Sequence, residues 1–157
     1  MIQIPLRNRA GEVIAFAVIS DADAPLAESN WYLHKKGYAT RQQPGGGRNR
    51  KLMLHRVILN APARVKVDHI NRDTLDNRRE NLRLASDAGN CQNRTLAKNN
   101  RSGFKGVRRD RGKWRAIIHT AGRWIHLGHY SKAVEAARAY DLAAIKFYGE
   151  FASPNFV

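Results

Sequence analysis

The last third of the chain changes periodicity once, and this change constrains the fold more than any other sequence feature. Three short runs alternate in polarity with the period of strands, at about 104–109, 113–120 and 123–129. The segment from Ser131 to Tyr148 instead carries alanines and aromatic residues at helical spacing, and Ser131 is a candidate N-cap. The pattern predicts a three-stranded antiparallel sheet packed on one helix.

The two faces of the predicted strands differ in chemistry. Trp114, Ala116 and Ile118 fall on one face of the second strand, while the opposite face is basic. Trp124 and His126 share one face of the third strand. One face suits a core against the helix. The other suits phosphates and base edges in the major groove of DNA, or is an ordinary solvated basic face with a structural tryptophan.

The net charge narrows the range of partners. The chain has 28 Lys and Arg against 13 acidic residues, a formal charge of +15, and such an excess favours a polyanion. No apolar stretch approaches the roughly 18 residues of a membrane span, and the N-terminus does not resemble a signal peptide. We therefore expect an intracellular protein, such as one in the cytoplasm of a bacterial host, that binds nucleic acid and no membrane.

The earlier part of the chain reads as mixed α and β structure. Residues 1–52 contain strand and turn signals, and we expect an extension that buttresses the next module, or one that adds DNA contacts. For residues 53–94, the sequence pattern predicts a short helix, two strands joined by a polar loop, and a second helix. Residues 95–102 form a polar linker to the module at 103–157. The predicted fold class is α+β.

Chemistry concentrates around Asp68 and His69, which are adjacent at a predicted strand end, and Asn90 in the following helix. Hard divalent cations take carboxylate and amide oxygens, and histidine titrates near neutrality, so it suits a general base. From composition and spacing alone, an ordinary Asn-rich loop is the favoured interpretation. Cys91 is the single cysteine, which excludes an internal disulfide and a zinc site built on paired cysteines.

A joint motif makes the interpretation specific. It comprises Leu54-His55-Arg56, Val67-Asp68-His69-Ile70-Asn71, residues 74–83 and Asn90-Cys91-Gln92-Asn93-Arg94. The segment resembles the HNH endonucleases of phage and intron-encoded homing type. The resemblance implies that His69 is the general base, that Asp68 and Asn90 bind Mg²⁺ or Mn²⁺, and that Asn81 braces the loop and orients His69. It implies a ββα-metal module, and because the chain has one cysteine we expect no structural zinc.

Other positions in this segment have simpler interpretations. His55 is expected to pack its helix against the hairpin, and Asn77 to occupy a turn. Arg78 and Arg79 are either phosphate contacts or a solvated face. Arg72 departs from the motif, because many relatives have glycine there.

The C-terminal segment carries a second motif. Ser102-Gly103-Phe104-Lys105-Gly106-Val107-Arg108, Gly112-Lys113-Trp114, residues 136–141 and Pro154-Asn155-Phe156 resemble the APETALA2/ethylene-response-factor DNA-binding domain. The resemblance implies a sheet docked in the major groove, but Arg111 and Ile117 depart from the plant pattern, so the plant target sequence does not carry over. The expected DNA-binding residues are Arg94, Lys105, Arg108, Arg109, Arg111, Lys113, Arg115, Arg123, Trp124, His126 and Tyr140.

Together these features predict a sequence-directed, divalent-metal-dependent DNA endonuclease acting on double-stranded DNA, with no small-molecule substrate. The alternative is a transcription regulator with an inactive HNH hairpin. The complete set of Asp68, His69, Asn81 and Asn90 favours the enzyme. A monomer is the default and a dimer is possible, and one active site per chain predicts nicking by a monomer and double-strand cleavage by a dimer.

Overall fold

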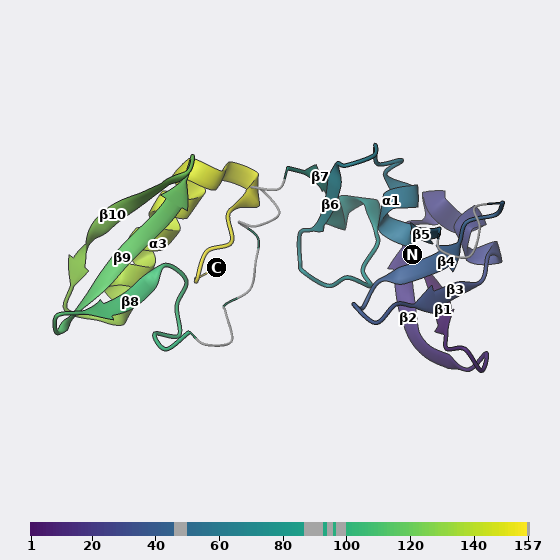
Figure 1. Cartoon of the computed structure of the whole chain (residues 1–157), viewed down its shortest axis with the longest axis horizontal. Coiled ribbons are helices and arrows are strands. Elements are labelled where there is room, and N and C mark those ends of the chain that lie inside the picture. Colours follow the sequence, from purple (N-terminus) through teal and green to yellow (C-terminus); the bar gives the residue numbers. More distant parts are fainter. Residues whose placement is uncertain (46–49, 87–92, 94–95, 97–99, 157) are drawn as a thin grey trace. The chain divides into compact units, whose positions relative to one another are not determined.

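The chain forms two compact units in the computed structural model, Met1–Asn90 and Cys91–Val157 (Figure 1). The structure describes residues 1–45, 50–86, 93, 96 and 100–156. Both units combine helices and strands, which confirms the α+β class. In the described segments, no helix is long and apolar enough to cross a membrane.

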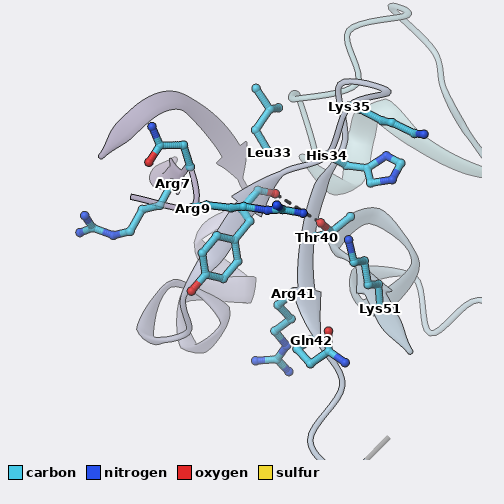
Figure 2. A pocket seen from close by; sticks show the side chains of 11 residues that line it. Arg7, Arg9, Leu33, His34, Lys35, Thr40, Arg41, Gln42 and Lys51 are labelled. Atoms are coloured by element: carbon cyan, nitrogen blue, oxygen red, sulfur yellow. Dashed lines mark hydrogen bonds between the residues drawn. The ribbon is translucent and has the colours of Figure 1, made fainter. Parts of the chain in front are cut away.

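The first unit is built on a five-stranded sheet with the order β2-β1-β3-β4-β5. Its strands are β1 (Ile2–Arg7), β2 (Val13–Ile19), β3 (Trp31–Leu33), β4 (Ala39–Gln42) and β5 (Lys51–Met53). Strand β1 runs antiparallel to β2 and parallel to β3. A pocket of about 620 Å³ opens on this sheet, lined in part by β3 and β4 (Figure 2).

The segment Asp21–Glu28 is a 3-10 helix, η1. Pro25 lies inside it. Because proline lacks a backbone N–H, Pro25 donates no hydrogen bond within η1.

The nuclease-like segment follows the sheet directly. It comprises α1 (Leu54–Ile58), β6 (Lys66–His69), the 3-10 turn η2 (Arg79–Asn81) and β7 (Leu82–Ala85). Strands β6 and β7 pair antiparallel, with Asp68 opposite Arg83 and His69 opposite Leu82. The helix predicted to follow β7, with its candidate ligand Asn90, lies outside the described residues, as does Arg94.

The N-terminal sheet and the loop between β6 and β7 are bonded together. The Val18 N–H donates to the Leu75 carbonyl at 2.8 Å, and the Asn77 N–H donates to the Val18 carbonyl at 2.7 Å. Arg79 pairs with the buried Asp23 at 2.7 Å. Residues from both segments form one core, which contains Ile4, Leu6, Ala17, Ile19, Trp31, Leu54, Ile58 and Leu82. Residues 1–52 therefore support the hairpin physically and do not form a separate body.

The second unit is a three-stranded antiparallel sheet with the order β10-β9-β8, packed on one helix as predicted. Its elements are β8 (Val107–Asp110), β9 (Lys113–Thr120), β10 (Arg123–Tyr130), α3 (Ala133–Tyr148) and the 3-10 turn η3 (Gly149–Phe151). The N-cap of α3 is Lys132 rather than the predicted Ser131. The Lys132 N–H donates to the Glu135 carboxylate at 3.3 Å, which satisfies one of the free donors at the helix start.

Gly106, just before β8, lies against the Tyr140 ring of α3. Its φ is +68°, and an added Cβ would lie 1.9 Å from the Tyr140 ring. We expect Gly106→Ala to lower the free energy of unfolding by about 1 kcal/mol through backbone strain and by a further 1–3 kcal/mol through overpacking. Gly103→Ala is a matched control, because φ is +77° there and the space is open. Urea unfolding measures both, and equal losses would contradict this packing.

Candidate active site and DNA-reading face

His69 ends β6 inside the first unit, where it is only 5% exposed. Two aromatic rings from other segments surround it. The His55 ring centroid lies 5.2 Å away in an edge-on arrangement, and the Tyr38 centroid lies 6.1 Å away. Tyr38 and His55 also contact each other at 5.1 Å. The imidazole is therefore held in a largely dry, aromatic environment.

Asn77 determines which nitrogen of His69 carries the proton. The Asn77 amide nitrogen donates to the Leu75 carbonyl at 3.0 Å, so the amide oxygen faces His69 Nε2, at 3.4 Å. An amide oxygen can only accept, so this contact favours the tautomer in which Nε2 carries the hydrogen. Asn77 is fully buried. It lies in an irregular stretch just before η2 rather than in the predicted turn, and nothing in the sequence spacing predicts its contact with His69.

The charge state of His69 suits proton abstraction. Burial lowers the pKa of His69, against the opposite effects of the Asn77 hydrogen bond and the nearby carboxylates. A lowered pKa keeps the imidazole neutral near pH 7, which is the form that accepts a proton.

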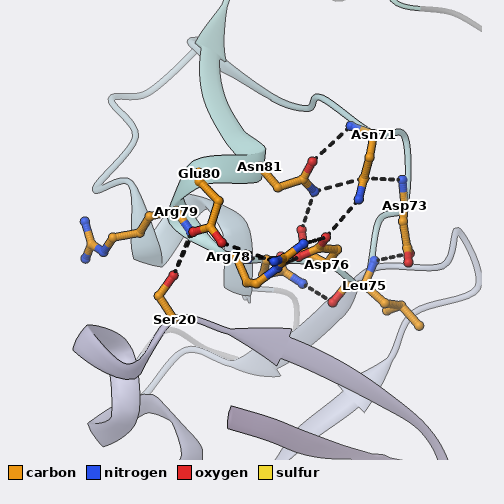
Figure 3. Close-up of polar contacts among 10 residues, drawn as sticks. Ser20, Asn71, Asp73, Leu75, Asp76, Arg78, Arg79, Glu80 and Asn81 are labelled. Atoms are coloured by element: carbon orange, nitrogen blue, oxygen red, sulfur yellow. Dashed lines mark hydrogen bonds and ion pairs between the residues drawn. The ribbon is translucent and has the colours of Figure 1, made fainter. Parts of the chain in front are cut away.

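Asn81 closes the loop that follows His69 (Figure 3). Its amide nitrogen donates to the Asn71 side-chain oxygen at 2.9 Å and to the Asp76 carbonyl at 2.7 Å. Its side-chain oxygen accepts from the Asn71 N–H at 2.9 Å, and its backbone carbonyl accepts from the Ile70 N–H at 2.9 Å. These bonds fix the two residues after His69, which is consistent with the bracing role expected of Asn81.

The two arginines of uncertain role in this loop both form ion pairs. Arg78 forms a two-pronged pair with Asp76, at 2.8 and 2.7 Å, and this pair lowers the pKa of the Asp76 carboxyl despite its burial. Arg79 pairs with Asp23. Arg78 therefore bonds within the loop, whereas Arg79 joins the loop to η1.

Arg72 adopts a φ of +67°, and its N–H donates to the His69 carbonyl at 2.9 Å. This is the left-handed region, which glycine adopts without strain. Arg72 therefore adopts the backbone conformation that glycine, the residue of many relatives at this position, adopts without strain.

Asp68 is buried and paired with Arg83 of the facing strand. Arg83 Nε and one terminal nitrogen both donate to Asp68 Oδ2, at 3.0 and 2.7 Å. Within the described parts of the chain, no group of three or more His, Cys, Asp or Glu could hold a metal. A single carboxylate supplemented by an amide oxygen and water is a donor set that suits a hard cation such as Mg²⁺, and Asp68 fits this role.

His55 is buried, and its Nδ1 has no hydrogen-bond partner. It lies at the start of α1 and packs that helix toward the hairpin, which agrees with the interpretation from sequence. Burial, with smaller contributions from His69 and Arg56, lowers the pKa of His55 to about 4. Protonation of His55 is therefore unfavourable in the folded chain.

This gives a prediction for stability in acid. The unfolded chain binds a proton at His55 below about pH 6.5, whereas the folded chain binds it only below about pH 4. Stability should therefore fall as the pH decreases across this window, by about 3 kcal/mol from His55 alone. A His55→Phe variant keeps an aromatic ring and should lose this part of the dependence. Chemical unfolding from pH 7 to pH 4 measures it, and parallel curves for both proteins would contradict it.

The exposed face of the second unit gathers basic and aromatic side chains. Strand pairing places Arg108 beside Arg115, and His119 beside Trp124. Arg108, Arg115, Ile117 and Trp124 line a hollow of about 290 Å³. Trp124 is 69% exposed, which is unusual for so large an apolar ring. Arg115 Nε is buried without a partner.

The other residues predicted to contact DNA do not all lie on this face. Lys113, Arg115 and Ile117 lie on one face of β9. Because Arg108 pairs with Arg115 and His126 pairs with Ile117, Lys113 and His126 share the face of Arg108. Arg111 lies at the turn between β8 and β9 with a φ of +48°. Strand alternation puts Arg123 on the face opposite Trp124.

Three further predicted contacts have partners inside the unit. Arg109 stacks on Trp114 at 5.0 Å, on the face opposite Arg108. The Lys105 ammonium donates to the Ser153 carbonyl at 3.0 Å and also to its hydroxyl. Tyr140 packs against Gly106, and burial raises its pKa to about 12.

Comparisons with known proteins agree with this arrangement. Residues 53–92 match the HNH endonuclease family, and residues 102–150 match the AP2 domain. A relative named as an uncharacterized HNH endonuclease, from Acanthamoeba polyphaga mimivirus, is 32% identical over 148 residues, which cover 89% of this chain and 74% of the relative. The chain belongs to the HNH endonuclease family and carries an AP2 DNA-binding domain after its HNH segment.

The plant relatives align with a smaller part of the chain. APETALA2-like protein 2 of Oryza sativa subsp. indica is 41% identical over 83 residues, which cover 47% of this chain and 19% of the rice protein. An AP2-like ethylene-responsive transcription factor of Arabidopsis thaliana is 45% identical over 58 residues, or 36% of this chain and 12% of the plant protein. This chain therefore spans less than a fifth of either plant relative.

Proposed function

We propose that the protein is a sequence-directed, divalent-metal-dependent endonuclease that hydrolyses phosphodiester bonds in double-stranded DNA. The observation that carries the proposal is the state of His69. It is buried, its pKa is lowered, its tautomer is fixed by Asn77, and it is adjacent to a buried carboxylate in a chain of the HNH family. A neutral histidine held in this way is a general base for activating water.

Each residue of the site has a defined task in this proposal. His69 Nδ1 accepts a proton from the attacking water, Asn77 holds the ring in the competent tautomer, and Asn81 fixes the loop behind it. Asp68 and Asn90 would hold Mg²⁺ or Mn²⁺. The bound cation supplies charge neutralisation at the scissile phosphate and the leaving oxygen. Arg83 holds the Asp68 carboxylate in position through two hydrogen bonds to Oδ2.

The second unit selects the DNA site. We propose that its sheet lies in the major groove and that the exposed face bearing Arg108, Lys113, Arg115, Trp124 and His126 reads the duplex. Arg94, Arg111 and Arg123 remain candidates for phosphate contacts. Lys105, Arg109 and Tyr140 would contact DNA only at the cost of the internal contacts described above, so we expect their contributions to be smaller.

Supercoiled DNA pools carrying candidate sequences test the function. Cleavage with Mg²⁺ and its loss in EDTA are expected, and the ratio of nicked to linear product reports whether one strand or both are cut. Tight, salt-sensitive binding without cleavage of the bound sequence would favour the alternative of a transcription regulator with an inactive hairpin.

A further inference from the structure

The pocket on the N-terminal sheet is strongly basic. Among the described residues that line it, five are cations and none is acidic (Figure 2); the cations are Arg7, Arg9, Lys35, Arg41 and Lys51. Cations that converge without a carboxylate repel one another, and a bound polyanion relieves that cost. We call this surface the basic groove.

Two of the five cations are held in place by the fold. The Arg41 guanidinium lies over the buried Trp31 ring at 5.1 Å and donates to the Ser29 hydroxyl. Arg7 donates to the Gly11 carbonyl at 2.7 Å. Because both side chains are already held, little side-chain entropy would be lost when a ligand binds their positive charges.

The other three cations, Arg9, Lys35 and Lys51, are exposed at the rim. No carboxylate in the described segments pairs with any of them. The loop arginines near His69 differ, because Asp76 and Asp23 neutralise Arg78 and Arg79. The basic groove thus retains its charge for a partner.

The basic groove and the proposed active site share one hairpin, β3–β4. His34 lines the groove, and its N–H donates to the Tyr38 carbonyl at 2.8 Å. The Tyr38 ring in turn lies 6.1 Å from the His69 ring. Thr74, in the loop after His69, donates to the Gly37 carbonyl at 2.8 Å. The hairpin of β3 and β4 therefore joins the basic groove to the catalytic histidine.

We infer that the basic groove binds the phosphate backbone of duplex DNA beside the cleavage site. The inference rests on the proposed function for the identity of the ligand. A duplex that places one phosphate at His69 carries further phosphates at intervals of about 3.4 Å per strand. The cations that line the groove come from β1 and the turn after it, from the β3–β4 hairpin and from β5, and they match that charge. The N-terminal sheet is then a third DNA-binding element, besides the HNH segment and the AP2 domain.

Charge reversal at the rim tests the inference. The full chain with Arg9→Glu and Lys51→Glu is compared with a control carrying Lys36→Glu and Arg64→Glu, two exposed cations of the same unit outside the groove. Both variants change the net charge equally. Affinity for a fluorescent duplex of random sequence is measured in EDTA at several salt concentrations, and thermal unfolding verifies that both variants are folded.

The groove variant should bind about tenfold more weakly, and the slope of log affinity against log salt should fall by about 1.8, since each phosphate contact contributes about 0.9. The control should change the slope little. Equal effects in both variants, or none in the groove variant, would overturn the inference. Because binding is measured without metal, a protein that never cleaves DNA but loses affinity in the groove variant would refute only the nuclease function.

Discussion

Replacing His69 with alanine is expected to slow DNA cleavage by about 10³-fold, since a positioned general base contributes between about 10² and 10⁴. Affinity for DNA should be nearly unchanged, because the ring is buried and the DNA-reading face belongs to the second unit. Single-turnover cleavage at saturating protein separates the two effects. A variant that cleaves at the wild-type rate would exclude His69 as the base.

Chemical rescue distinguishes catalysis from structure at this position. His69→Gly leaves a space among Tyr38 and His55, and added imidazole should restore part of the cleavage rate if the missing group is a base. Asn77→Ala should lower the rate while leaving a basic ring in place, because the ring loses the acceptor that fixes its tautomer. Imidazole should not rescue that variant.

The second large effect concerns the buried pair of Asp68 and Arg83, whose side chains are 8% and 11% exposed. We expect Arg83→Leu to lower the free energy of unfolding by about 3–5 kcal/mol, because it leaves a carboxylate buried without its cation. Urea unfolding in EDTA measures this loss in the absence of divalent cations. A loss below about 1 kcal/mol would mean that solvent screens the pair.

A double-mutant cycle provides the control for this prediction. Asp68→Leu/Arg83→Leu replaces the pair by apolar side chains and should recover much of the stability lost in Arg83→Leu alone. Cleavage should remain absent in the double variant, because the proposed metal ligand is gone. Recovery of stability without recovery of activity would separate the structural role of Arg83 from the chemical role of Asp68.

The second unit was the part most readily predicted from sequence. Its contacts are between neighbours in the chain, and its two-residue turns carry glycine where φ is positive, at Gly112 and Gly122. Periodicity therefore predicts both the strands and their faces. The exceptions are Arg109 and Arg123, which the strand register places on the opposite face.

The surroundings of the active site were less predictable, because they depend on contacts between distant segments. The motif identifies His69, but Tyr38 reaches it from a hairpin some thirty residues earlier, and β1 contains Pro5, a residue that usually interrupts strands. The parallel pairing of β1 with β3 that organises this sheet leaves no local sequence signal. The basic groove follows from that pairing and was therefore not visible in the sequence.

The most direct test of the account is cleavage of one labelled duplex, selected for tight binding, by the wild-type protein and by Asp68→Asn across a titration of Mg²⁺. We predict hydrolysis by the wild-type protein that requires Mg²⁺ and stops in EDTA, together with a much higher Mg²⁺ requirement or no cleavage for Asp68→Asn. Equal cleavage in EDTA, or none by wild-type protein saturated with this duplex in Mg²⁺ or Mn²⁺, would contradict a metal-dependent endonuclease centred on Asp68 and His69.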